Sequence, residues 1–129
     1  MDPVRCSWCS DDPLYQRYHD EEWGVPCRDA ESLFEMLMLE GFQAGLSWIT
    51  VLRKREHYRQ VYRGFDIDFM ANQTDDELQA LLQDPGIIRN RLKVDAAIAN
   101  AARFQELRES HGGFGAWLDT HHPRPREAW

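Results

Sequence analysis

The sequence predicts an all-α fold built as one domain over residues 1–129. Apolar residues recur with a helical period along most of the chain, and alternating strand patterns are absent. Helix boundary signals accompany that period: a Thr-x-x-Glu capping box at 74–77 and a Gly-Gly pair at 112–113. A chain of 129 residues can bury a hydrophobic core without disulfides.

The apolar pattern divides the chain into six expected helices. They span residues 12–20, 31–43, about 46–62, 75–83, 90–110 and 114–118. The helix at 31–43 should carry an apolar stripe that includes Leu37. The helix at 90–110 should turn Leu92 inward together with Ile98 and Phe104.

Charge and cysteine content restrict the class of protein. The formal net charge of −7 argues at first against nucleic acid, but net charge reports on long-range fields and not on local surfaces. An odd number of cysteines, three, favours reduced thiols or a metal site over a disulfide framework. No apolar run reaches the roughly 18 residues of a membrane span, and the first residues lack the apolar core of a signal peptide. A cytoplasmic protein without a membrane partner is expected.

Positive charge gathers in two stretches despite the acidic balance. The basic residues are Arg53, Lys54, Arg55, Arg59 and Arg63 in one stretch, and Arg89, Arg91 and Lys93 in the other. Each stretch is either a solvated helix face or a surface for an anionic partner.

Residues 81–101, LLQDPGIIRNRLKVDAAIANA, are typical of a helix, a Pro-Gly turn and a second helix. Backbone N–H groups at Gly86 and at the next helix start can bind a phosphate oxygen, and Arg89, Arg91 and Lys93 would add charge. A helix–hairpin–helix module holds DNA in this way without reading its sequence. A plain helical hairpin fits the same pattern, and Ile88 stands where the usual consensus has its second glycine, so both interpretations stay open.

Residues 39–56 suggest a ligand pocket. Glu40 ends an apolar stripe beside two glycines, and Trp48 follows within one short connection. A carboxylate there is either a helix-surface charge or a deliberately desolvated group. The N-terminal third adds further aromatic residues: Trp8, Tyr15, Tyr18 and Trp23. Aromatic faces with one carboxylate suit a flat, cationic, hydrogen-bonding ligand, whereas the alternative is that these rings belong to the core.

At these residues the sequence resembles bacterial 3-methyladenine DNA glycosylase I, a family of the helix–hairpin–helix superfamily. The matching stretches are RCSW at 5–8, DPLYQRYHDEEWGVP at 12–26, LFEMLMLEGFQAGLSWITVLRKRE at 33–56 and GIIRNRLKVDAAIANA at 86–101. The resemblance implies a helical glycosylase domain and monofunctional hydrolysis of the N-glycosidic bond of 3-methyladenine. It further implies a monomer that acts on double-stranded DNA carrying alkylated adenine and needs no organic cofactor.

The resemblance also implies roles for individual residues. Glu40 would recognise the base and support catalysis, and Trp48 would stack on the base. Trp8, Tyr15, Tyr18 and Trp23 would line the rest of the pocket. Leu46 would fill the gap that the flipped nucleotide leaves.

A structural zinc site is implied only in part. Cys6 and His19 match two zinc ligands of the family, whereas Cys9 is expected to be incidental. Family members continue beyond this point by roughly a quarter of their length, and that segment carries the other two ligands. Two rival interpretations follow: a truncated, non-catalytic protein that binds damaged DNA or free 3-methyladenine, and a plain helical bundle with no nucleic-acid role.

Overall fold

The computed structural model describes residues 4–27 and 29–121, and every regular element within these ranges is helical. The all-α prediction is therefore confirmed. His122 and the residues after it lie outside the described ranges. The elements are a 3₁₀ turn η1 (Ser7–Cys9) and the helices α1 (Pro13–Glu21), α2 (Ala30–Gln43), α3 (Trp48–Val61), α4 (Ile67–Ala71), α5 (Asp75–Leu82), α6 (Arg91–His111) and α7 (Phe114–His121).

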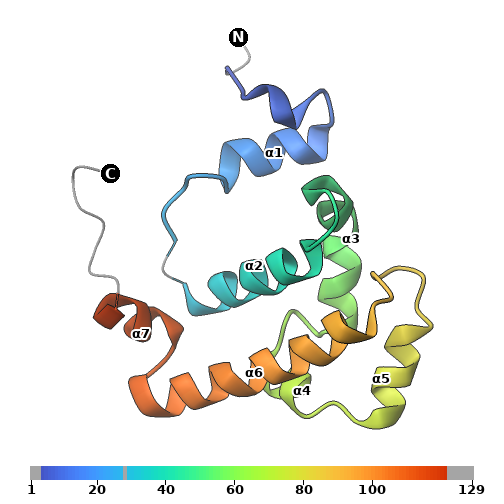
Figure 1. The fold of residues 1–129 in the computed structure, drawn as a ribbon. Coiled ribbons are helices and arrows are strands. Elements are labelled where there is room, and N and C mark those ends of the chain that lie inside the picture. Colours follow the sequence, from blue (N-terminus) through green and yellow to red (C-terminus); the bar gives the residue numbers. More distant parts are fainter. Residues whose placement is uncertain (1–3, 28, 122–129) are drawn as a thin grey trace.

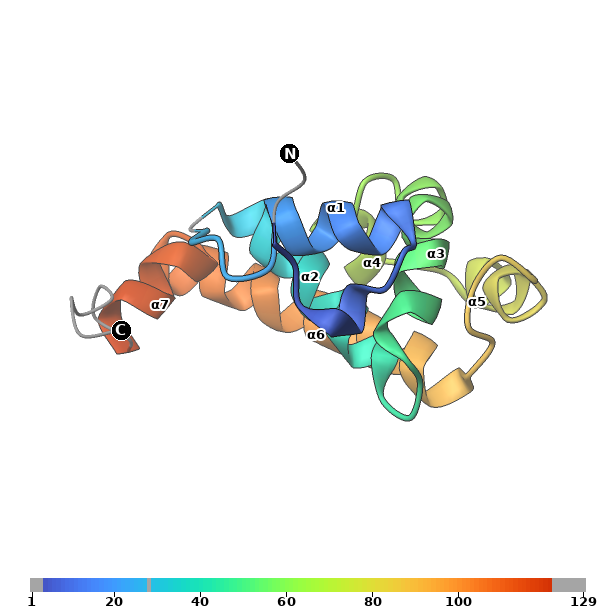
Figure 2. The same cartoon turned by 90° about the horizontal axis from the view of Figure 1, so that it is seen from above.

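The helices form layers on either side of α2 (Figure 1). Helix α1 lies on one side of α2 and the long helix α6 lies on the other, while α3 packs against both α1 and α2. Helix α5 lies beside the beginning of α6, and α7 folds back against α2 and α6 (Figures 1 and 2). Among residues 4–27 and 29–121, no helix combines the length and the apolar character needed to cross a bilayer.

One hydrophobic core joins α2, α3 and α6. Its centre is a stack of three aromatic rings, with centroids 4.5 Å apart between Phe42 and Tyr58 and 6.0 Å apart between Tyr58 and Tyr62. Phe34 meets Phe104 edge to face at 4.8 Å and connects the stack to α6. Buried aromatic rings contribute large apolar areas to the stability of a fold.

Two predictions of inward-facing residues are wrong. Leu92 is 79% exposed and Leu37 is 43% exposed. The buried residues of α6 begin at Val94 and continue at Ala97 and Ala101, with helical spacing. Leu92 precedes that row by two residues, so it points about 160–200° away from the core.

Helix α4 is an element that the sequence pattern did not predict, because its five residues are too few to show a period. Asp66 caps it by accepting a hydrogen bond from Phe69 N at 3.0 Å. Met70 is fully buried, and Asp68 receives a 2.6 Å ion pair from Arg108 of α6. The short helix therefore closes the face of α6 that α2 leaves uncovered.

The first basic stretch is not a continuous solvated face. Arg55 bridges Glu22, at the end of α1, and Glu35 of α2, with N–O distances of 2.7 and 2.6 Å. Arg59 adds a 2.7 Å contact to Glu35, and Arg53 holds the α1 cap Asp12 at 2.9 Å. These arginines connect α1 and α2 to α3 through ion pairs with carboxylates of the protein itself.

The hairpin between α5 and α6 is held by side chains. Asp84 accepts hydrogen bonds from Gly86 N at 2.7 Å and from the His57 ring at 2.7 Å. The hydroxyl of Tyr58 accepts the N–H of Ile88 at 3.1 Å. The predicted sequence of helix, turn and helix is therefore confirmed, and α3 supplies its support.

Glu35 should make stability depend on pH. Burial raises its pKa, but hydrogen bonds from Arg59 and Arg55 outweigh burial and leave the pKa below the ordinary value of 4.5. A lowered pKa stabilises the fold above the unfolded-state value, and this contribution is lost as pH falls through the folded-state value. We expect Glu35→Gln to lower the free energy of unfolding at pH 7 by about 2–3 kcal/mol. When the pH falls below 4.5, the variant should lose less of its remaining stability than the wild type loses.

Urea unfolding of both proteins at pH 7 and pH 3 tests this expectation. The matched control is Glu56→Gln, because Glu56 pairs with the same Arg59 at 3.4 Å but is 74% exposed. It should change stability by less than about 1 kcal/mol at either pH. If the wild type and Glu35→Gln lose the same free energy of unfolding between pH 7 and pH 3, the role given to Glu35 is wrong.

Gly86 should not tolerate a larger residue. A Cβ at this position would lie 2.4 Å from Cδ2 of His57, and the His57 ring is held by Asp84. We expect Gly86→Ala to reduce thermal stability by about 1–3 kcal/mol, and the loss should shrink in a His57→Ala background. Gly41→Ala is the control, since an added Cβ there has no neighbour within 4 Å. A loss of equal size in both backgrounds would show that the His57 ring is not the obstacle.

Candidate functional site

Five aromatic rings from η1, α1, α3 and the segment after α1 form one cluster. Trp8 contacts Tyr15, Tyr18 and Trp23, with centroid distances of 5.1, 6.2 and 5.5 Å. Tyr18 then reaches Trp48 at 5.4 Å. All five predicted pocket aromatics are thus brought together. None is fully buried. Trp8 and Trp23 are 39% and 51% exposed and lie outside the hydrophobic core, whereas Trp48 packs against that core.

Local sequence explains how α1 presents its rings. Asp12 caps the helix by accepting hydrogen bonds from Leu14 N and Tyr15 N, and Pro13 suits the first helical position. Tyr15 and Tyr18 are three residues apart and therefore share a face. The chain leaving the helix turns back as Trp23 N donates to Tyr18 O at 3.0 Å, which brings the Trp23 ring to the cluster.

Glu40 stands near the end of α2 and is exposed, which favours the first of the two alternatives, a charge on the helix surface, over a desolvated group. The reason is its place on the helix, since its neighbour Leu39 takes the buried position. The charge of Glu40 still acts on the cluster. Burial first, and then the negative charge of Glu40, raises the pKa of Tyr18 above 10.0. Tyr18 therefore keeps its proton at neutral pH and can donate a hydrogen bond.

A type II turn connects Glu40's helix to Trp48's helix. Ala44 has φ −50° and ψ 120°, Gly45 has φ +82°, and Leu46 N donates to Gln43 O at 2.7 Å. The positive φ explains the glycine. The side chain of Gln43 also donates to Leu46 O at 2.6 Å. The turn presents Leu46 with 37% of its surface exposed.

Lys93 lies elsewhere than predicted. Its ammonium donates to Phe42 O at 2.7 Å and to Ala44 O at 2.6 Å, so it caps the end of α2 and does not extend to solvent for a phosphate. Nothing in the sequence pattern signals this contact, because it joins residues 51 and 49 positions apart. Gln43 is likewise a residue that sequence reasoning missed, although a glutamine just before a glycine turn is a usable signal.

The hairpin offers a smaller anion-binding surface than predicted. The amide of Gly86 is already bonded to Asp84, so it is not available in this structure. Arg89 and Arg91 are exposed, and Arg91 lies 3.5 Å from Asp95. The first amides of α6, at Arg91 and Leu92, have no acceptor within the helix. The surface that suits phosphate therefore runs over residues 89–92.

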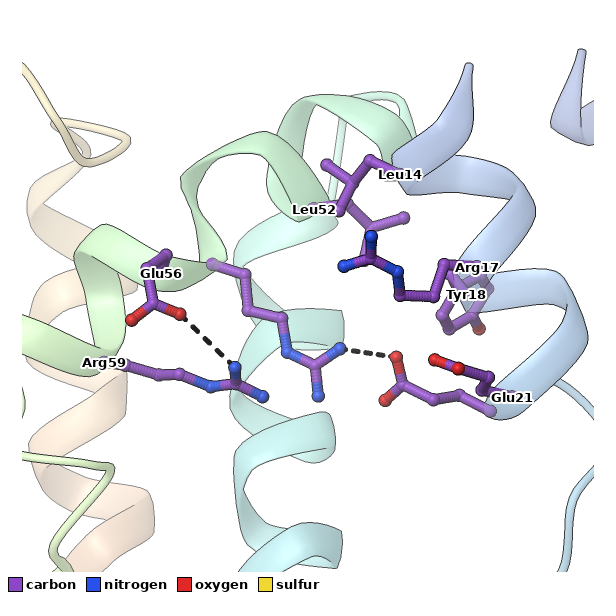
Figure 3. A pocket seen from close by; sticks show the side chains of 9 residues that line it. Leu14, Arg17, Tyr18, Glu21, Leu52, Glu56 and Arg59 are labelled. Carbon is purple, nitrogen blue, oxygen red and sulfur yellow. Dashed lines mark hydrogen bonds and ion pairs between the residues drawn. The ribbon is translucent and has the colours of Figure 1, made fainter. Parts of the chain in front are cut away.

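A cavity of about 420 Å³ opens on the other side of Tyr18, between α1 and α3. Figure 3 shows Tyr18, Arg17 and Glu21 on one wall and Leu52, Glu56 and Arg59 on the other. Charges of both signs line it, and neither Glu40 nor Trp48 does. This cavity is therefore distinct from the surface that carries Glu40 and Trp48.

Cys6 and His19 are brought together at the edge of the cluster. Cys6 N donates to Nε2 of His19 at 3.3 Å, while Nδ1 of His19 contacts Asp20 at 3.0 Å. Arg5 in turn holds Asp20 at 2.8 Å. Within the described part of the chain, no group of three or more histidine, cysteine, aspartate or glutamate side chains could hold a metal. Two such residues are fewer than the four protein ligands of an ordinary structural zinc site.

Comparison with known proteins agrees with this arrangement. A family model described as methyladenine glycosylase matches residues 8–127. The chain is 52% identical over 106 residues to DNA-3-methyladenine glycosylase 1 of Escherichia coli (strain K12), which covers 82% of this chain and 57% of that protein. It is 42% identical to DNA-3-methyladenine glycosylase of Haemophilus influenzae (strain ATCC 51907 / DSM 11121 / KW20 / Rd), over 89% of this chain and 62% of that protein. The chain thus spans about three fifths of the length of these curated relatives.

Solved structures show the same helical architecture. A crystal structure of 3-methyladenine DNA glycosylase I superposes with a TM-score of 0.86 at 48% identity, over 91% of this chain and 64% of that one. The enzyme of that name from Staphylococcus aureus, solved for its recognition of 3-methyladenine, gives a TM-score of 0.88 at 32% identity, over 95% of this chain and 65% of that one. The chain therefore belongs to the methyladenine glycosylase family.

Proposed function

We propose that this protein is a monofunctional DNA glycosylase that hydrolyses the N-glycosidic bond of 3-methyladenine in alkylated double-stranded DNA. One observation carries the proposal: five partly exposed rings meet beside the carboxylate of Glu40 and the turn that presents Leu46. A monomer in the cytoplasm is part of the same proposal.

The chemistry needs selective capture more than strong acid catalysis. Methylation at N3 makes the adenine cationic, so the base leaves as a neutral molecule with the electron pair of the C1′–N9 bond. Water then adds to C1′ and loses a proton. Before this step the nucleotide has to leave the stack, which costs a few kcal/mol and least for a damaged base.

The aromatic cluster would distinguish the cationic base from ordinary adenine. Stacking on Trp48 adds a cation–π attraction of about 1–2 kcal/mol, toward the lower value where the rings face solvent. The carboxylate of Glu40 would accept hydrogen bonds from the amino edge of the base and favour its positive charge. The protonated hydroxyl of Tyr18 is available as a donor. Neutral adenine loses the charge-dependent part of this binding and would be released uncut.

The remainder of the DNA would be held outside the cluster. Leu46 would fill the space that the flipped nucleotide leaves, because it is an exposed apolar side chain at the tip of a turn. Arg89 and Arg91, with the first amides of α6, would contact the phosphate backbone without reading sequence. Holding the phosphate backbone in this way is the role that a helix–hairpin–helix module would have in the complex.

A second function, binding of damaged DNA or free 3-methyladenine without turnover, is favoured by one observation. The side chain of Glu40 is exposed to solvent. Water then weakens the electrostatic contribution of the carboxylate to the transition state. The two functions differ in a single measurement, the release of free 3-methyladenine from methylated DNA.

Glu40→Gln tests the catalytic proposal. Loss of the negative charge should leave folding intact and lower kcat/KM for 3-methyladenine release by about 10- to 100-fold, because a hydrogen bond to a charged group contributes about 1.5–3 kcal/mol. Chromatography of the base released from methylated duplex DNA gives the rate. Glu31→Gln, an exposed carboxylate in the first turn of the same helix, is the control. Unchanged excision by Glu40→Gln would remove Glu40 from the mechanism, and no excision by the wild type would leave only the binding function.

We also propose that Cys6 and His19 are two ligands of a structural zinc ion, with the others supplied from outside the described residues. Two features support this. The Nδ1–H of His19 faces the Asp20 carboxylate, and a carboxylate behind a histidine is a frequent companion of zinc. The Nε2 of His19 lies next to Cys6, whose backbone N–H it accepts here, and this nitrogen is the one that would bind the metal.

Elemental analysis by mass spectrometry checks the zinc proposal. Gently purified protein should contain zinc, and Cys6→Ser and His19→Ala should each reduce the zinc-to-protein ratio by at least half. Cys27→Ser is the control, since Cys27 is exposed and distant in sequence from both proposed ligands. A molar ratio near zero in the wild type rejects the site in this chain.

A further inference from the structure

We propose that Lys93 is a positioning residue that braces the turn carrying Leu46 and thereby ties the hairpin to the aromatic cluster. The inference rests on the proposed function, because the turn matters only if the protein bends and opens DNA. Its basis is a pair of short hydrogen bonds, from Lys93 Nζ to Phe42 O at 2.7 Å and to Ala44 O at 2.6 Å.

The ammonium meets an electrostatic demand at the end of α2. The last carbonyls of a helix have no partner within the helix, and together they carry a partial negative charge. Phe42 O and Ala44 O are such groups, and Lys93 neutralises both from a different helix. Side-chain entropy opposes this contact, so a lysine held here in half-buried form indicates that the end of α2 needs to stay in one conformation.

The turn is fixed from two sides. Gln43 holds both polar backbone groups of Leu46, through its own carbonyl at 2.7 Å and its side-chain amide at 2.6 Å. Lys93 holds the carbonyl of Ala44 on the opposite side of Gly45, which alone in the turn has a positive φ. A loop that inserts a side chain into DNA has to keep its conformation while it contacts the base stack, because small displacements of positioned groups lower the reaction rate.

Lys93 also stands close to the DNA end of α6. It is the third residue of that helix, and its backbone N–H is capped by Asn90 at 3.1 Å. The first turn of α6 therefore carries both the phosphate surface at residues 89–92 and the lysine that binds the carbonyls at the end of α2. Lys93 therefore couples the position of the hairpin to the position of the turn, although Lys93 itself does not contact the phosphate.

The test uses Lys93→Met, which keeps the length of the side chain and removes the ammonium. The readout is the fluorescence of 2-aminopurine placed opposite a stable abasic analogue in duplex DNA, which rises when the protein unstacks the site. We expect the rise to fall to less than half of the wild-type value and kcat to drop roughly 10- to 100-fold. Binding of free 3-methyladenine, followed by tryptophan fluorescence, should change less than twofold, and Lys93→Arg should recover part of the loss.

The salt dependence of duplex binding separates positioning from phosphate contact. Lys93→Met should leave the slope of log K against log salt unchanged, whereas Arg91→Met, the matched control, should reduce it by about one. A slope reduced by one in Lys93→Met would overturn the inference in favour of a phosphate contact. Unchanged fluorescence and kcat would overturn it as well.

A second variant guards against misfolding. Gln43→Ala removes the other brace without altering charge and should reproduce the loss of fluorescence with an unchanged salt slope. If circular dichroism shows that Lys93→Met is unfolded, Gln43→Ala decides the question. Unstacking of the duplex by Gln43→Ala at the wild-type level would then overturn the proposal that the turn is braced. A wild-type chain that does not unstack the duplex refutes the proposed function together with this inference, while a wild-type response that both variants retain refutes the inference alone.

Discussion

The parallel stack of Phe42, Tyr58 and Tyr62 is the interaction on which the rest of the structure depends. It fixes the end of α2 against the C-terminal end of α3 with near-parallel rings. Phe42 lies one residue before the turn that leads to Leu46, and Tyr58 uses its hydroxyl to hold Ile88 in the hairpin. This stack thus connects the turn before the Trp48 helix with the hairpin between α5 and α6.

The two surfaces are joined by polar contacts of different strength. Tyr58 and His57 reach the hairpin from α3, while Lys93 reaches back from α6 to α2. Neutral hydrogen bonds contribute about 1 kcal/mol each, whereas contacts made by charged groups contribute more. Charged groups take part at both places, through the Asp84 carboxylate at the hairpin and the Lys93 ammonium at the turn.

Much of the fold was predictable because helical periodicity is a local property of sequence. The boundaries of α1, α2, α5 and α6 agree with the predicted helices to within one or two residues, and the capping box at Thr74 and Glu77 forms as expected. The exposed Leu92 was assigned inward because periodicity gives the spacing of an apolar row and not which row faces the core.

The gathering of the candidate site's aromatic residues could be predicted, but the exposure of its side chains to solvent could not. The aromatic residues do gather, since their spacing on α1 is local and the family resemblance supplies the rest. The exposure of Glu40 and the inward contacts of Arg55 and Lys93 depend on partners far away in sequence. No pattern within a single helix contains that information.

Helix α1 has no buried residue, and this has a consequence for the timescale of recognition. Its attachments are rings at the surface and ion pairs such as Arg53 with Asp12, not a share of the central core. A segment attached in this way forms its own cooperative unit, which opens at a free energy well below that of global unfolding. Its amides should therefore exchange with solvent long before those of α6. If the aromatic cluster binds a base as proposed, local opening of this outer layer would limit how long the base stays bound, while the core and the hairpin remain closed.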